Sequence, residues 1–168
     1  MDWYEAAWDY AIRTDAHDGS LSSLPVEWQR ELVALARVCR QVNNGGYLQF
    51  LANHGRETYV YASQALRKIG AHQMVAIVDA CQALVDEHSP SEGKSHDELM
   101  QLLPNLVIGR DGSTVKEPGS VLPEPIIERV RELSYEFMNY PDAVGDLAQD
   151  YYGPLIESDE TGPSGRGG

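Results

Sequence analysis

The sequence predicts an all-α fold, a compact bundle of about seven helices that forms one domain over residues 1–157. Three observations lead to this prediction. Apolar residues recur at intervals of three and four along most of the chain, which is the spacing of one helix face. Clusters of Gly, Pro and Asn separate these stretches. The 168 residues are 42% hydrophobic, and a chain of this length buries a core without needing a disulfide or a metal.

The expected helices have apolar faces at helical spacing and end at turn residues. In chain order they are 3–12, 26–42, 47–52, 59–69, 72–87, 95–103, 125–138 and 143–152. In the first of them we expect Tyr4, Ala7, Trp8, Ala11 and Ile12 to face the core. A small hairpin is expected near 106–116, around Asp111-Gly112. Residues 158–168 lack apolar residues, which predicts a disordered C-terminal tail.

The segment Asn43-Asn44-Gly45-Gly46 separates two of the predicted helices. Asn and Gly tolerate the left-handed backbone conformation that closes a helix, and Asn also caps the helix that follows. We therefore interpret the motif as structural, a tight corner between two helices. Asn53 ends the next short helix in the same way.

The chain is strongly acidic, with 26 Asp and Glu against 13 Lys and Arg and a formal net charge of −13. A surface of this sign repels phosphate and anionic lipid, and its long-range field attracts basic partners. Direct binding to nucleic acid or to a membrane surface is therefore not expected. A basic protein is the partner that the charge favours.

The acidity is regional. Residues 117–160 contain eleven acidic side chains, opposed by Arg129 and Arg131. Seven of the acidic residues recur at intervals of four, which on a helix places a carboxylate about every 6 Å along one side. They are Glu124, Glu128, Glu132 and Glu136 on one helix, and Asp142, Asp146 and Asp150 on the next. Such rows are either the solvated faces of two helices or a surface for a basic protein.

No catalytic motif stands out. The five histidines form no HExxH or HxH pattern, and GxSxG, GxGxxG and Walker sequences are absent. Cys39 and Cys81 lie inside apolar helical patterns and suggest buried free thiols rather than a disulfide framework. We predict no enzyme activity, no metal and no cofactor. The N-terminus lacks a signal peptide and no apolar run reaches about 20 residues, so a cytoplasmic location is expected.

Residues 41–53 (QVNNGGYLQFLAN) resemble the signature of the DNA-mimic protein family, in which a Val-Asn-Asn-Gly-Gly-aromatic segment precedes Gln, further aromatic residues and Asn. Residues 65–71 and 133–152 resemble later segments of the family, and the likeness spans most of residues 25–155. The resemblance implies a helical fold. It also implies a partner, because the family is named for a member that displays carboxylates in place of DNA phosphates and so occupies a transcription factor.

Four functions remain open at this point. The first is a DNA mimic that occupies the DNA-binding surface of a transcription factor or another basic protein. The second is an immunity or antitoxin-like inhibitor of a basic nuclease, which uses the same electrostatics. The third is a small enzyme or metabolite-binding protein. The fourth is a homodimeric scaffold, which exposure of Trp3 or Tyr4 would favour.

Overall fold

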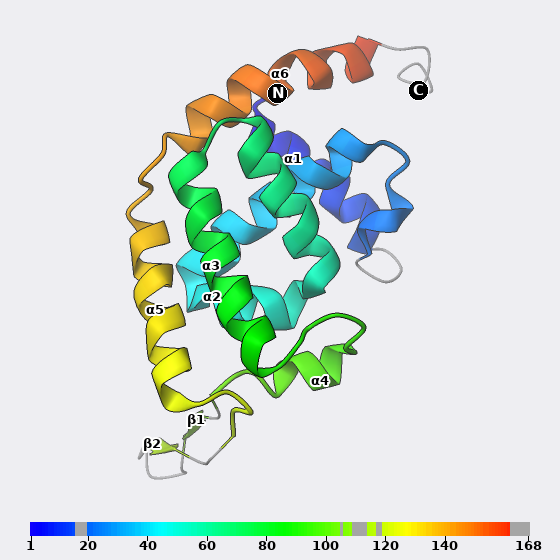
Figure 1. Ribbon diagram of the computed structural model, residues 1–168. Coiled ribbons are helices and arrows are strands. Elements are labelled where there is room, and N and C mark those ends of the chain that lie inside the picture. Colours follow the sequence, from blue (N-terminus) through cyan, green and yellow to red (C-terminus); the bar gives the residue numbers. More distant parts are fainter. Residues whose placement is uncertain (16–19, 105, 109–113, 117–118, 162–168) are drawn as a thin grey trace.

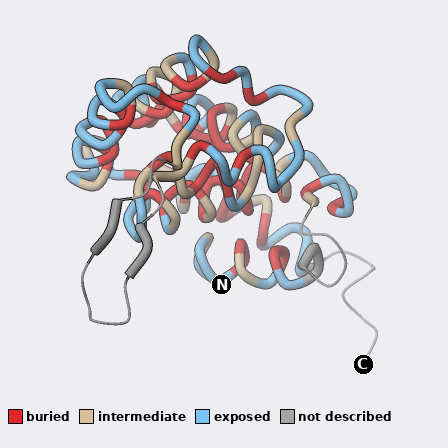
Figure 2. Tube along the Cα trace, turned by 90° about the horizontal axis from the view of Figure 1, so that it is seen from below, coloured by how far each residue is buried: buried red, intermediate tan, exposed pale blue. Residues whose placement is uncertain are grey.

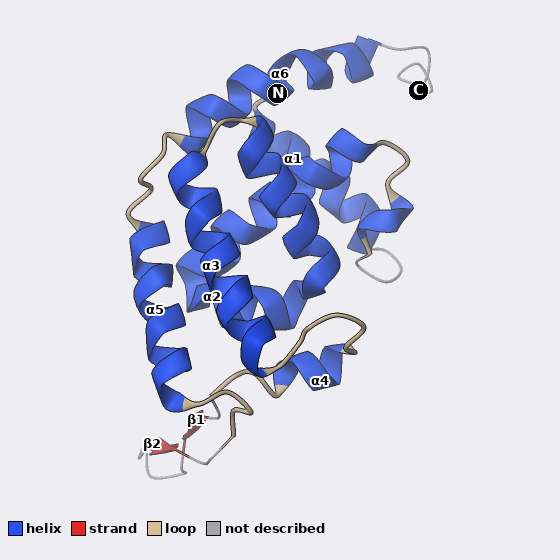
Figure 3. Cartoon of the chain, viewed as in Figure 1, coloured by secondary structure: helices blue, strands red, loops and turns tan. Residues whose placement is uncertain are grey.

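The computed structural model of the chain describes residues 1–15, 20–104, 106–108, 114–116 and 119–161 (Figure 1). The prediction of an all-α bundle is confirmed. The helices are α1 (Trp3–Asp15), the 3-10 helix η1 (Leu21–Ser23), α2 (Glu27–Lys68), α3 (His72–His88), α4 (His96–Met100), α5 (Glu124–Met138) and α6 (Val144–Thr161). Strands β1 (Leu106–Ile108) and β2 (Thr114–Lys116) pair antiparallel, with Val107 opposite Val115, within the predicted range 106–116. The predicted turn around Asp111-Gly112 lies outside the described residues. Figure 3 shows this hairpin at the end of the molecule where α5 begins.

Helix α2 is bent twice, at Gly46 and at Gly55, whose backbone φ angles are 82° and 76°. A positive φ is unfavourable for residues that have a Cβ atom, whereas glycine adopts it readily. The two bends divide α2 into three straight segments, which correspond to the three helices expected at 26–42, 47–52 and 59–69. The glycine positions in the sequence therefore marked bends inside one continuous helical element.

Each bend releases a backbone group that another helix binds. The Tyr47 N–H, just after the first bend, donates to the Ser134 hydroxyl of α5 at 3.0 Å. The Ala52 carbonyl, before the second bend, lies 3.1 Å from Nδ1 of His96 in α4. Buried backbone groups need such partners. The bends therefore fix where α4 and α5 dock on α2.

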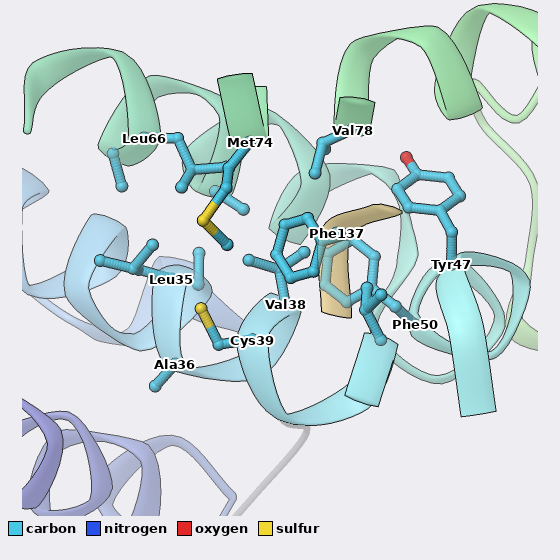
Figure 4. Close-up of a cluster of buried hydrophobic side chains, with 14 of the residues drawn as sticks. Leu35, Ala36, Val38, Cys39, Tyr47, Phe50, Leu66, Met74, Val78 and Phe137 are labelled. Carbon is cyan, nitrogen blue, oxygen red and sulfur yellow. The ribbon is translucent and has the colours of Figure 1, made fainter. Parts of the chain in front are cut away.

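The core lies between α2, α3 and α5. Figure 4 shows Phe50 of α2 and Phe137 of α5 close together, with Val38 and Met74 beside them. All four side chains are buried. Figure 2 shows the buried positions concentrated toward the centre of the bundle, with exposed positions on the outer sides of the helices. Both cysteines are buried free thiols, as the sequence predicted.

The predicted inner face of α1 was wrong by one position. Ala6, Ala7, Tyr10 and Ala11 are buried, whereas Tyr4 is 37% exposed and Ile12 is 66% exposed. The two faces share Ala7 and Ala11, and Trp8 of the predicted face is half-buried against the core. Packing against α2 and α6 therefore turns the side with Ala6 and Tyr10 inward, in place of Tyr4 and Ile12.

Helix α6 continues to Thr161, nine residues beyond its predicted end at 152 and four beyond the predicted domain end at 157. Gly153 and Pro154 follow the predicted end, and proline removes a hydrogen bond from a helix interior. Burial overrides this preference, since Tyr152 and Ile156 are buried on the inner side of α6. The predicted tail is therefore helical over 158–161, and residues 162–168 lie outside the described part of the chain.

The short helix expected at 95–103 is present as α4 but covers only His96–Met100. It begins with a capping box in which Ser95 and Glu98 bind each other's backbone N–H groups. Among the described helices, none combines the length and the apolar character that crossing a bilayer requires.

Candidate protein-binding surface

The predicted acidic row on α5 is exposed along its whole length: Glu124, Glu128, Glu132 and Glu136 all face solvent. This orientation follows from the opposite face of the helix. Ile127, Val130, Leu133 and Phe137 are buried against α2 and α3, which turns the glutamates outward. The row predicted from the fourfold spacing is therefore present in the folded molecule.

Two arginines partly neutralise that row. Arg129 lies 2.9 Å from Glu132 and 3.8 Å from Glu136, and Arg131 pairs with Glu128. Exposed ion pairs of this kind contribute only about 0.2–1 kcal/mol to folding, so they can exchange partners with little loss. The two arginines nevertheless reduce the negative field of α5, so positive and negative side chains alternate along this surface.

Asp142 does not belong to the second predicted row. α6 begins at Val144, and Asp142 lies in the turn before it. Its carboxylate accepts a hydrogen bond of 2.8 Å from the Met74 N–H at the start of α3, and a longer one of 3.4 Å from Gln73. A carboxylate at this place satisfies a free N–H group of α3 and interacts well with the helix dipole. The structure therefore gives Asp142 a capping role.

Asp146 and Asp150 are exposed on α6, and the longer helix adds further carboxylates that the sequence prediction missed. Asp146, Asp150, Glu157 and Glu160 fall within about 80° of one another around the helix and span roughly 21 Å along it. All four side chains are exposed. α6 contains no Lys or Arg. We call these four residues the α6 stripe.

One acidic residue near the end of α6 serves the fold instead. Asp159 accepts a hydrogen bond of 2.6 Å from the Tyr10 hydroxyl of α1 and one of 3.4 Å from Gln29 of α2. At the other end of α6, Gln149 accepts a hydrogen bond of 2.8 Å from the Trp3 N–H. The α6 stripe is thus held on a helix that is tied to α1 at two points.

The two acidic surfaces do not lie on one line. Figure 1 shows α5 along one side of the bundle and α6 turning away from it across the top, over α1. The turn between them contains Tyr140, whose φ of 48° is the one positive value at a non-glycine residue in the described chain. The predicted surface therefore consists of two parts that meet at this turn.

The Asn-Asn-Gly-Gly motif forms the corner that the sequence predicted. Asn43 donates to the Cys39 carbonyl at 2.6 Å and to the Tyr140 hydroxyl at 2.5 Å, which links α2 to the α5–α6 turn. Gly45 is covered by the Gln49 side chain, so a Cβ there would displace it. A Cβ at Gly46 would lie 3.3 Å from the Ser134 hydroxyl and would require a positive φ. Asn44 is exposed beside this corner.

Asn53 lies away from the acidic surfaces, in an amide cluster. Its side chain donates to the side-chain oxygen Oε1 of Gln41 at 3.3 Å, and the Gln49 side chain donates to the same oxygen at the same distance. His54 follows, and burial together with Arg37 and Arg40 lowers its pKa to about 4. This part of α2 is therefore a neutral to basic region in an acidic protein.

The polar network in the interior is structural in character. Tyr47 donates to Gln82 at 2.6 Å, Gln82 donates to Ser91 at 2.7 Å, and Ser91 donates to Asp86 at 2.8 Å. Burial alone would raise the pKa of Asp86, but the hydrogen bonds that this carboxylate accepts lower its pKa to about 2. Arg56 pairs with Asp86 at 2.6 Å. Every polar group of this network thus has a partner, which suits a fixed core.

Groups suited to metal binding or nucleophilic chemistry do not gather in the described residues. Within them, no cluster of three or more His, Cys, Asp or Glu could hold a metal ion. Burial raises the pKa of the Cys39 and Cys81 thiols to about 12, which removes their nucleophilic form at neutral pH.

Comparison with known proteins gives one match. A family model described as DMP19-like protein matches residues 22–158. No curated protein and no solved structure matches the chain. The matched range includes α2 with its two bends, all of α5 and most of α6, and so covers the α5 row and the α6 stripe except Glu160.

Proposed function

The chain belongs to the DMP19-like protein family, a family of DNA mimics, and from this premise we propose that it binds a basic, DNA-binding protein in the place of DNA. The role is one of occupancy rather than catalysis. The partner's cationic surface would accept carboxylates where it otherwise accepts phosphates.

The α6 stripe is the observation that carries this proposal. Its four carboxylates are exposed, lie on one side of the helix and have no Lys or Arg within the same helix. Like charges so close together raise the free energy of the isolated protein. A basic partner removes that cost on binding, and its approach is accelerated by the field of the whole molecule.

The α5 row supports the same role more weakly. Arg129 and Arg131 lie among its glutamates, so part of its negative charge is already compensated. A partner that contacts α5 must exchange those ion pairs or present acidic groups of its own to the arginines. We therefore assign the main contact to α6 and a flanking contact to α5.

The test is capture of a DNA-binding protein that DNA displaces. The full-length chain is immobilised, a native lysate is passed over it at low salt, and the retained proteins are eluted with a short DNA duplex. We expect a basic DNA-binding protein in this eluate, and we expect retention to fall steeply as salt rises, because screening shortens the reach of surface charges. If duplex DNA displaces no retained protein, the proposal is wrong.

A pair of charge-matched variants locates the surface. The first carries Asp146→Asn, Asp150→Asn and Glu160→Gln, all in the α6 stripe. The second carries Glu87→Gln, Glu92→Gln and Asp97→Asn, which are equally exposed but lie in α3, α4 and the loop between them. Both change the net charge by three. We expect the first to lose the DNA-displaceable protein and the second to retain it; equal retention would contradict the role of α6.

A further inference from the structure

A cavity of about 670 Å³ opens beside the start of α6, between α1, α2 and the α5–α6 turn. Its wall contains three aromatic side chains, Trp3, Tyr4 and Tyr140. Asn44 of α2 and Asp146 of α6 also line it. The cavity therefore adjoins the α6 stripe and shares Asp146 with it.

The aromatic side chains are held in place before any ligand arrives. The rings of Trp3 and Tyr4 meet edge to face, with centroids 5.4 Å apart. Tyr140 is fixed by the hydrogen bond from Asn43 and occupies a left-handed backbone conformation, which is unfavourable for a non-glycine residue. Such strain persists only where the surrounding structure enforces it. The cavity is thus prearranged rather than formed by loose surface side chains.

The charge inside the cavity is also arranged. Asp142 lies at its wall but is committed to the N-terminus of α3. Arg40 lies at its edge, with its guanidinium carbon 4.6 Å from the centre of the Trp8 ring, so its charge is already placed over an aromatic face. Asp146 is exposed in the first turn of α6. A ligand in the cavity therefore meets aromatic faces on one side and a carboxylate on the other.

We propose that this cavity receives an arginine side chain of the basic partner. A guanidinium is planar, stacks on aromatic rings and donates in parallel to a carboxylate, whereas a lysine ammonium is a strongly hydrated point charge. Asp146 accepts from the guanidinium, and the Asn44 side-chain carbonyl provides a second acceptor. The inference rests on the proposed function, because it names the residue type with which the partner enters the acidic surface.

The experiment uses small probes, so that it does not depend on the partner. N-acetyl-arginine amide, its neutral citrulline analogue and N-acetyl-lysine amide are titrated into the full-length protein, and the NMR signals of the Trp3 indole N–H and the Tyr140 ring are followed. We expect both signals to shift with the arginine probe and to shift about tenfold more weakly with citrulline, since cation–π contacts and the ion pair are lost. Equal shifts with citrulline or with lysine would overturn the assignment to arginine.

Two variants connect the probe to the cavity. Asp146→Asn keeps the shape and removes the charge, and we expect it to weaken the arginine probe about five- to tenfold. Asp97→Asn is the matched control, because Asp97 is also an exposed acidic residue in the first turn of a helix, and it should change the affinity by less than about twofold. Identical behaviour of the two variants would place the probe elsewhere and end the proposal.

The outcome separates this inference from the proposed function. If the probe fails to shift Trp3 and Tyr140 while a DNA-displaceable protein still binds, the arginine site is wrong and the acidic surface stands. If the probe binds in the cavity as expected but no DNA-displaceable protein is captured, the site stands and the DNA-mimic function is wrong.

Discussion

Helices α5 and α6 both display acidic residues, but they are built differently. α5 packs against α2 and α3 along its length and carries two arginines among its glutamates. α6 packs on α1 and α2 through buried residues such as Tyr152 and Ile156, carries no basic residue, and adds a hydrogen bond between Tyr10 and Asp159 near its end. The comparison indicates that charge regularity and charge availability are separate properties. The more regular row is the one with arginines on its own helix.

Truncating the inner face of α5 should have the largest effect. Phe137 is buried between α2 and α3, and Phe137→Ala should lower the free energy of unfolding by about 3–5 kcal/mol, because it leaves a cavity in the core. Urea denaturation measures this loss. Tyr135→Ala on the exposed side of the same helix should change stability by less than about 0.5 kcal/mol. A loss below about 1 kcal/mol for Phe137→Ala would show that α5 is not anchored as described.

Replacing Gly46, at the bend where α5 docks, should have the next largest effect on stability. Gly145 in α6 serves as the comparison. Gly46→Ala should destabilise the protein by about 1–3 kcal/mol, since a backbone with φ 82° and ψ 177° is essentially restricted to glycine. Gly145→Ala in the first turn of α6 has open space around the added Cβ and should be neutral or stabilising by about 0.4–1 kcal/mol. Thermal unfolding distinguishes them, and effects of the same sign would remove the contrast.

Removing the tie at the end of α6 should loosen that helix locally. Tyr10→Phe deletes the donor to Asp159, a hydrogen bond worth about 1 kcal/mol. Amide hydrogen exchange in residues 153–161 should accelerate about fivefold, while exchange in α5 should not change. Tyr151→Phe, on the exposed side of α6, serves as control. Equal acceleration in both helices would mean that α6 does not open independently.

Replacing the two arginines of α5 should have the smallest effect on stability, although it makes the surface of α5 more negative. The double variant Arg129→Gln, Arg131→Gln should lower stability by at most about 1 kcal/mol, because the ion pairs are exposed. At low salt it should bind an oligolysine peptide several-fold more tightly than the unmodified protein. The difference should disappear near 1 M salt, where charges on the surface are screened from each other beyond about 3 Å. Unchanged affinity at low salt would show that the arginines do not limit the negative field of α5.

Sequence periodicity predicted the helices well where local pattern and packing agree. The positions of α2, α3 and α5 and the corners at Gly46 and Gly55 followed from apolar spacing and glycine placement. The inner face of α1 and the end of α6 did not, since both depend on tertiary contacts. In α1, packing buries the side that contains Ala6 and Tyr10. In α6, Ile156 is buried and the helix continues past Pro154.

The candidate surface was predicted only in part for the same reason. The α5 row followed directly from residues spaced by four, and the sequence also placed Arg129 and Arg131 among them. The α6 stripe required the true end of the helix, which Pro154 concealed. The cavity brings together Trp3 and Tyr140, residues far apart in the chain, and depends on a left-handed Tyr140 that no local sequence rule specifies.

The two buried thiols provide a built-in reporter of motion. Cys39 lies on α2 and Cys81 on α3, both shielded and both with a pKa near 12, so a thiol reagent can modify them only after the core has opened. The chain has no other cysteine. Cys39 also lines the cavity beside the start of α6, so displacement of that end of α6 exposes it, whereas Cys81 becomes exposed when α3 separates from the core. The two thiols therefore report on different motions.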